Sequence, residues 1–222
     1  YYRPAPEITE RRRTFEVTWE NRGSLSGGHE LTWGLGYRNT WDDTTGTASV
    51  ILTPPSHVEE LSSGFISGDL RLSDKTRLTI GAKIEHNGYT GWEFQPSIRA
   101  LHRPSETDTL WAAVSRAVRT PSRIDHFGRI NYQAFPGMGG LPTYVALFGN
   151  PGFVSEKLIS NEAGWRTRLS ENANLDVSAF YNLYTDLRTF EPKPGYLEGT
   201  PPNGVAPFTF ENKLRGETFG FE

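Results

Sequence analysis

Cysteine is absent from this chain of 222 residues, so neither a disulfide framework nor a thiolate metal site can form. Histidine is scarce, and its five residues, at positions 29, 57, 86, 102 and 126, show no metal-ligand spacing. We therefore expect no metal centre. No residue pattern indicates a cofactor or a catalytic site, so we expect a protein that is not an enzyme.

Long hydrophobic runs are also absent. No stretch approaches eighteen consecutive apolar residues, which excludes a membrane-spanning helix. It does not exclude membrane-spanning strands, because these need only about 9–11 residues of alternating character. The formal net charge of −3 argues against a nucleic-acid-binding face, which is normally basic.

What the sequence does contain is a two-residue alternation of apolar and polar side chains, typical of β-strands. The clearest run is 77–86, where Leu78, Ile80, Ala82 and Ile84 alternate with polar residues. An Arg or Lys on the lipid face costs about 2–4 kcal/mol at the midplane of a bilayer, so we assign the charged face of each strand inward. Nine strands are expected, at residues 13–21, 30–38, 61–72, 77–86, 93–102, 109–119, 162–169, 175–184 and 208–222.

The connections between these strands are, in order, short, long, short, medium, short, long, short and long. A membrane barrel has short periplasmic turns on one side and longer extracellular loops on the other. The alternation therefore indicates an antiparallel transmembrane β-barrel with its long loops outside the cell. The longest connection follows strand 109–119 and holds about forty residues that are expected to be irregular, without confident helices.

Strand 109–119 has the least clear pair of faces. Its Leu110, Ala112, Val114 and Val118 face includes Arg116, and its other face carries Trp111 and Arg119. We place the leucine face outward, with Arg116 near the outer interface, where the cost of a charge is small. The opposite assignment is left open by the pattern alone.

Several segments, in order, resemble the barrel of TonB-dependent outer-membrane receptors. Leu110-Trp-Ala-Ala-Val-Ser-Arg-Ala-Val-Arg-Thr-Pro-Ser122 resembles the family's strand ending in Arg-x-Pro-Ser, and Gly149-Asn-Pro-Gly-Phe-Val-Ser-Glu156 its Gly-Asn-Pro-x-Leu-x-x-Glu motif. Phe153 stands where the family usually has leucine. Glu162–Trp165, Ser178–Asn182 and Gly216–Glu222 resemble the strands that follow.

This resemblance implies part of a 22-stranded barrel in the bacterial outer membrane. It implies active, TonB-dependent uptake of a scarce nutrient, such as an iron–siderophore complex or cobalamin. The expected partners are membrane lipid, a plug domain, the TonB complex and a small metal-chelate ligand. Residues 1–222 are expected to be a partial barrel domain, incomplete at both ends, because the plug and the terminal strands are missing from this sequence.

Two other functions are compatible with the pattern of the residues: a passive porin-like channel without a plug, and a soluble secreted β-sandwich that binds carbohydrate. For the receptor, candidate ligand contacts are polar and aromatic residues of the longest loop, because function concentrates on long loops held by a rigid scaffold. Any one of them is more often an ordinary loop residue or a contact that holds the loop in place. The candidates are Arg119, Arg123, His126, Arg129, Tyr132, Tyr144 and Phe148.

Overall fold

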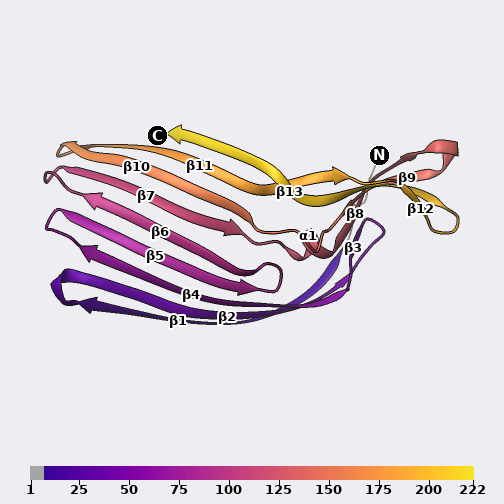
Figure 1. Cartoon of the computed structure of the whole chain (residues 1–222), viewed down its shortest axis with the longest axis horizontal. Helices are drawn as coiled ribbons and strands as arrows, with labels where there is room; N and C mark the ends of the chain where they lie inside the picture. Colours follow the sequence, from indigo (N-terminus) through magenta and orange to yellow (C-terminus); the bar gives the residue numbers. More distant parts are fainter. Residues whose placement is uncertain (1–7) are drawn as a thin grey trace.

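The computed structural model describes residues 8–222, and most of them belong to one β-sheet. Nine long antiparallel strands lie side by side in a single layer (Figure 1). In spatial order they are β1 (Thr9–Leu25), β2 (His29–Thr45), β4 (Ser56–Arg71), β5 (Thr76–Asn87), β6 (Gly91–His102), β7 (Asp108–Arg119), β10 (Glu156–Ser170), β11 (Ala173–Pro192) and β13 (Asn203–Phe221).

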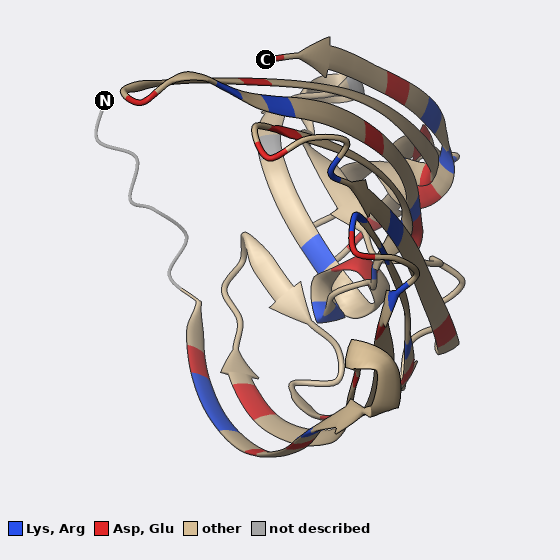
Figure 2. Ribbon diagram, turned by 90° about the vertical axis from the view of Figure 1, so that its left-hand side faces the viewer, with Lys and Arg blue, Asp and Glu red and all other residues tan. Residues whose placement is uncertain are grey.

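Each of the nine predicted strands coincides with one of these nine, so the all-β antiparallel fold class is confirmed. Seen from the side, the layer curves into a trough-like wall (Figure 2). The short turns lie at one end of the wall, and the long connections gather at the other (Figure 1). Among the described residues, no helix has the length and apolar character needed to cross a membrane.

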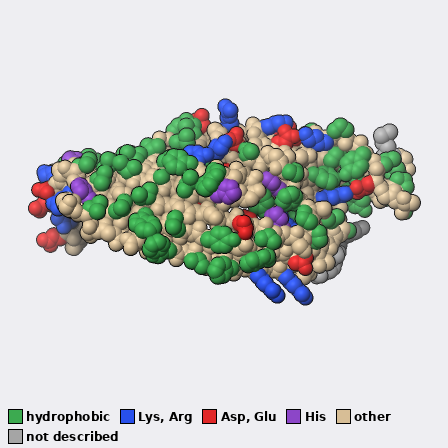
Figure 3. Space-filling model, turned by 60° about the horizontal axis from the view of Figure 1, so that its bottom comes forward, with side chains coloured by type: hydrophobic (Ala, Val, Ile, Leu, Met, Phe, Trp, Pro, Cys, Tyr) green, Lys and Arg blue, Asp and Glu red, His purple; other side chains and the backbone are tan. Residues whose placement is uncertain are grey.

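The register places apolar side chains from neighbouring strands on one common face. Ile98, for example, pairs with Ile80 on one side and Val114 on the other. Large apolar side chains of this face are exposed, and Trp19 and Trp92 keep 56% and 69% of their surface. In Figure 3 hydrophobic side chains lie along the wall, while many of the charged ones lie towards its ends. Such a face suits contact with lipid.

A soluble sandwich would bury this face against a second sheet. Instead, the fully buried apolar side chains among residues 8–222 are few and lie near the long connections: Ala146, Phe153, Val205 and Phe210. The described strands therefore form one wall with two exposed faces, and the sandwich alternative has no core to support it.

The register also answers the question raised by strand β7. Leu110 and Ala112 pair with Trp165 and Ala163 of β10, so they belong to the apolar face. Arg116 shares that face, near the end that carries the long connections, where the β6–β7 pairing has stopped at Ser97 and Ser115. Its guanidinium donates a hydrogen bond to the carbonyl oxygen of Phe94, which that gap leaves available.

The prediction that the longest connection is irregular is wrong. It contains helix α1 (Arg123–Phe127), strand β8 (Gly128–Pro136), a 3₁₀ turn at Met138–Gly140 and strand β9 (Pro142–Phe148). The other two long connections contain β3 (Val50–Leu52) and β12 (Tyr196–Glu198). A further 3₁₀ turn, Ser26–Gly28, joins β1 to β2. Strand β3 escaped prediction because it is short and its partner β8 is far away in the sequence. Strands β8, β9 and β12 have partners nearby, but their Pro- and Gly-rich flanks are typical of loops.

Candidate functional site

The three long connections join into one small sheet at the end of the wall. Strand β9 pairs in parallel with the first residues of β13, and β8 pairs with both β9 and β3. Strand β12 pairs with β13 beside them. We call the assembly of β3, β8, β9, β12 and the first part of β13 the loop sheet. Its strands come from connections that are far apart in the sequence, so it ties them together.

Asp125 in helix α1 is the centre of the contacts that anchor the loop sheet to the wall. It is fully buried and accepts hydrogen bonds from the backbone N–H and the hydroxyl of Ser122, at 2.9 and 2.8 Å. Its two carboxylate oxygens lie 3.1 Å from Arg188 on β11 and 3.6 Å from Arg119 on β7. Burial alone would raise the pKa of Asp125, but these hydrogen bonds and cations hold its pKa below the usual value.

A second ion pair connects α1 to the other side of the trough. Arg123 donates to the carboxylate of Asp42 on β2, and both side chains are buried. The same guanidinium donates to the carbonyl oxygen of Pro55 at 2.8 Å. Because β2 and β11 are separated by five intervening strands, a five-residue helix bridges distant parts of the wall. We call the contacts of α1 with Asp42, Arg119 and Arg188 the brace.

The segment Gly149–Glu156 completes the brace from the other end of the long connection. Asn150 donates two hydrogen bonds: its backbone N–H donates to the Asp125 carbonyl oxygen at 2.8 Å, and its side-chain amide donates to the Phe210 carbonyl oxygen at 3.0 Å. Gly149 passes so close to α1 that a Cβ there would lie 2.6 Å from the backbone of His126. Glu156 lies 3.1 Å from Arg119 and accepts the N–H of Arg188 at 2.8 Å.

His126 is buried inside this assembly, not presented to solvent. Its Nε2 lies 2.9 Å from the carbonyl oxygen of Phe153, so that nitrogen carries the proton. Its ring packs edge-on against Tyr89 in the β5–β6 turn, with centroids 4.8 Å apart. Arg119, Arg123 and His126, three of the seven predicted ligand residues, thus lie within the brace or directly beside it.

Arg129 and Phe148 lie together in the loop sheet. The guanidinium of Arg129 covers the Phe148 ring at 5.2 Å and pairs with both carboxylate oxygens of Glu198. The hydrogen bond from Arg129 lowers the pKa of Glu198. This pair connects β8 to β12, so it joins two of the long connections. Tyr144 is half-buried between β8 and β13.

Tyr132 differs from the other six predicted residues, because 66% of its surface is exposed on β8. Phe135, on the same strand, is 40% exposed. The chain from Ile130 to Ser155 contains no charged residue. The β8–β9 hairpin therefore presents an uncharged surface with aromatic rings, and such surfaces bind apolar or aromatic groups of a small molecule.

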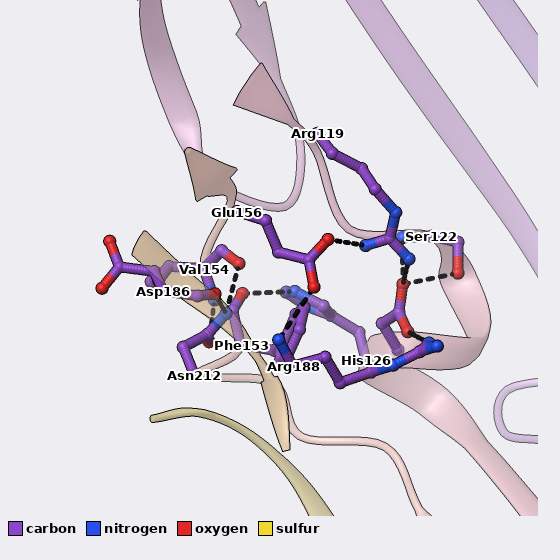
Figure 4. Close-up of polar contacts among 10 residues, drawn as sticks. Arg119, Ser122, His126, Phe153, Val154, Glu156, Asp186, Arg188 and Asn212 are labelled. Carbon is purple, nitrogen blue, oxygen red and sulfur yellow. Dashed lines mark hydrogen bonds and ion pairs between the residues drawn. The ribbon is translucent and has the colours of Figure 1, made fainter. Parts of the chain in front are cut away.

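Sequence reasoning missed the carboxylates that pair with the predicted arginines: Asp42, Asp125 and Glu198. It also missed Arg188, which pairs with Asp125, and Asn212. Asn212 on β13 makes two hydrogen bonds with the backbone of Val154 (Figure 4). Its side-chain oxygen accepts from the Val154 N–H at 2.9 Å, and its side-chain nitrogen donates to the Val154 carbonyl oxygen at 3.0 Å. The signal that could have found Asp125 is its position three residues after Ser122, a helix-start pattern. No local signal links Asp42 to Arg123, which is 81 residues away.

Comparison with known proteins places the chain within a family. The sequence matches the family described as TonB dependent receptor-like, beta-barrel, over residues 1–222. The iron-regulated outer membrane virulence protein of Vibrio cholerae is 26% identical over 200 residues, which cover 88% of this chain and 29% of that protein. The ferric enterobactin receptor of Pseudomonas aeruginosa is 29% identical over 101 residues, covering 45% of this chain and 14% of the receptor.

Solved structures show the same wall. The siderophore receptor PirA of Acinetobacter baumannii has a TM-score of 0.77 and 16% identity, covering 96% of this chain and 34% of PirA. At that identity the likeness shows the fold alone. The chain spans less than a third of the length of the Vibrio cholerae relative, and about a third of PirA.

Proposed function

The chain belongs to the TonB-dependent receptor β-barrel family, and from that membership we propose that the intact protein imports a scarce nutrient across the outer membrane. Proteins of this family are receptors and transporters. The wall described above lies in the bacterial outer membrane, as the family's barrels do. The proposed cargo is a small metal chelate such as an iron–siderophore complex, or cobalamin, and the proposed energy source is the TonB complex.

The observation that carries this proposal is the family match over the whole chain. The architecture supports it, because the wall has short turns at one end and a braced loop sheet at the other (Figure 1). The relatives' names refer to iron and to a siderophore. We propose that residues 1–222 are about nine strands of a larger barrel whose remaining strands and plug belong to the same protein.

Within this function, we propose that the loop sheet forms part of the extracellular face that captures the ligand. Tyr132 is the most exposed of the seven candidates and the best placed for direct contact. Arg129, Tyr144 and Phe148 form the sheet beneath it, and Arg119, Arg123 and His126 support that sheet from the brace. The seven residues thus remain one proposed group, with direct and supporting parts.

Uptake is tested in the source bacterium by deleting the gene and restoring it on a plasmid. Radiolabelled ferric siderophores and cobalamin are offered one at a time under nutrient limitation, with and without a functional TonB. We expect loss of uptake of one substrate class on deletion, recovery with the plasmid, and no recovery without TonB. Uptake that persists without TonB would favour the porin-like channel, and so would an upstream sequence without a plug domain.

A further inference from the structure

A hollow of about 420 Å³ lies on the apolar face of the wall, near the end that carries the long connections. Cations from three strands line it: Arg116 on β7, Lys157 on β10 and Arg215 on β13. We call it the cation hollow. Arg116 pairs with Ile159, which shares the apolar face with Ala163 four residues further along β10. The cation hollow therefore opens on the side of the wall that we assign to lipid.

A β-bulge lies at the edge of the cation hollow. Thr185 and Asp186 of β11 stand opposite a single residue of β13, Arg215. Such a bulge bends its strand and re-aims the side chains beside it. Thr185 also pairs with Lys157 of β10 on its other side. The bulge thus brings the cations of β10 and β13 to the border of one hollow.

Cations outnumber carboxylates in the lining of the cation hollow. Its three cations face one carboxylate, Glu217, which accepts a hydrogen bond from the Tyr181 hydroxyl at 2.8 Å. Lys157 also pairs with Asp186 at 2.6 Å. Arg215 is exposed and makes no ion pair with any residue in the range 8–222. An anion that enters the cation hollow therefore meets more positive than negative charge.

Arg116 is the cation held closest to the wall. Its guanidinium donates to the carbonyl oxygen of Phe94 and lies 3.8 Å from Glu93. The Glu93 carboxylate is buried and accepts a hydrogen bond from Ser155 at 2.5 Å. A guanidinium has five N–H donors, so these contacts leave some of them for a further acceptor.

A second hollow, of about 540 Å³, lies further along the same face. Ala112 on β7, Ala163 on β10 and Ala179 on β11 pair in one row across it. We call it the alanine hollow. The larger apolar side chains around this row are Leu110, Trp165 and Val177. The small side chains leave an apolar groove between the larger ones.

The two hollows are spaced for one elongated molecule. Ile159 borders the cation hollow and Ala163 the alanine hollow, so the two are about 13 Å apart along β10 at about 3.3 Å per residue. One leaflet fills half of a hydrocarbon core of about 30 Å. A lipid with its headgroup in the cation hollow therefore has acyl chains long enough to reach the alanine hollow.

We propose that the two hollows bind one lipid that carries a phosphate group in its headgroup. The phosphate oxygens accept charge-assisted hydrogen bonds from the three cations, and an acyl chain fills the alanine hollow. A free phosphate ion would use the first hollow alone, and a neutral lipid the second alone. The inference goes beyond nutrient uptake, because it concerns the outward face of the wall and needs neither cargo nor TonB.

The test uses the purified intact receptor in phosphatidylcholine vesicles. The probe is phosphatidylglycerol with brominated acyl chains, because bromine quenches the fluorescence of a tryptophan that it touches. Trp165 lines the alanine hollow, so the signal is the quenching that Trp165→Phe removes. We expect the brominated phosphatidylglycerol to bind there about tenfold more strongly than brominated phosphatidylcholine, as an added charge-assisted contact provides.

Variants of each hollow separate the two contributions. The triple variant Arg116→Gln, Lys157→Gln and Arg215→Gln should bring the preference close to one and leave quenching by brominated phosphatidylcholine unchanged. Arg215→Gln alone, at an exposed position, should lower the preference about threefold. Ala163→Leu fills the alanine hollow and should reduce quenching by both lipids. Heat-modifiable electrophoretic mobility checks that each variant forms its barrel.

The double variant Arg11→Gln with Arg13→Gln is the matched control. These arginines lie on the same face and at the same end of the wall, on β1, where Arg13 pairs with Trp41, and neither lines a hollow. The control should keep the tenfold preference. Equal binding of the two lipids to the wild type would overturn the proposal, and so would an unchanged preference in the triple variant. Inorganic phosphate that abolishes the preference would show a site for a free ion instead.

Discussion

The buried pair between Arg123 and Asp42 allows a quantitative test of the brace. Their side chains are 9% and 7% exposed, so Asp42→Ala leaves a guanidinium inside the protein without a counter-charge. Burial already lowers the pKa of Arg123, which shows that water does not stabilise its charge well. The carbonyl oxygens of Pro54 and Pro55 remain as acceptors, but they carry no full charge.

Removing one partner of a buried ion pair costs about 3–5 kcal/mol, which corresponds to a factor of about 10² to 10⁴ in a local opening equilibrium. We expect the cost to appear in the loop sheet, since α1 is what joins it to β2. Hydrogen exchange of backbone amides in β8 and β9 measures this opening in the intact receptor. Protection there should fall by that factor in Asp42→Ala, while the amides of β5 should keep theirs.

Two further variants separate charge burial from general damage. Lys193→Ala removes an exposed ion pair with Glu211 and should change protection by less than about 1 kcal/mol. The double variant Asp42→Leu with Arg123→Met replaces both charges by apolar groups, and such replacements are often close to neutral. It should recover most of the lost protection. Unchanged protection of β8 and β9 in Asp42→Ala would refute the idea that this pair holds the loop sheet.

Four other outcomes are expected. Ile80→Arg puts a charge on the lipid face at a cost of about 2–4 kcal/mol and should impair barrel assembly, measured by heat-modifiable electrophoretic mobility, whereas Lys83→Ala on the polar face should not. Residues 1–222 produced alone should aggregate, because β1 is paired only with β2 among the described strands and leaves an open edge; a detergent-free monomer on a sizing column would contradict this. Tyr132→Ala should weaken ligand binding without changing protection of β8 and β9, whereas His126→Ala should reduce that protection; the reverse pattern would exchange their assigned roles. The hydrogen bond from Arg129 lowers the pKa of Glu198 in the folded protein. The stability that this pair contributes is therefore complete above the pKa of Glu in the unfolded chain, about 4.3, and is lost as the pH falls through the lower pKa of the folded protein. Hydrogen-exchange protection of the loop sheet should hold from pH 7 to 5 and decline only below about pH 4.

The wall could be predicted from sequence because the patterns that determine it involve residues close together in the chain. Two-residue alternation fixes which face a side chain joins, and short turns such as the one between Arg71 and Thr76 fix the neighbour. The predicted strands were shorter than the real ones for the same reason. Near the long connections the side chains on both faces become polar, so alternation stops while backbone pairing continues, as in the stretch of β2 from Asp42 to Thr45.

The loop sheet could not be predicted as a whole, because the pairings that join one long connection to another are remote in sequence. Arg129 and Glu198 are 69 residues apart, and the parallel pairing of β9 with β13 joins Tyr144 to Val205. Nothing local distinguishes an arginine that will be buried from one that will face a ligand. The sequence therefore could not assign Arg123 a role as part of a brace, since that role depends on Asp42 as much as on Arg123.

The two motif segments hold the base of the long connection rigid. Arg119-Thr-Pro-Ser122 and Gly149–Glu156 meet at Asp125, so the ends of the long connection are held together by contacts that do not involve the β8–β9 hairpin. The hairpin of β8 and β9 projects from that closed base. A change at Tyr132 therefore alters the exposed surface and leaves the base unchanged, whereas a change at Asp125 loosens every residue of the hairpin at once. In the proposed receptor, the hairpin would therefore set ligand selectivity while the charged groups that fix it stay buried beneath it.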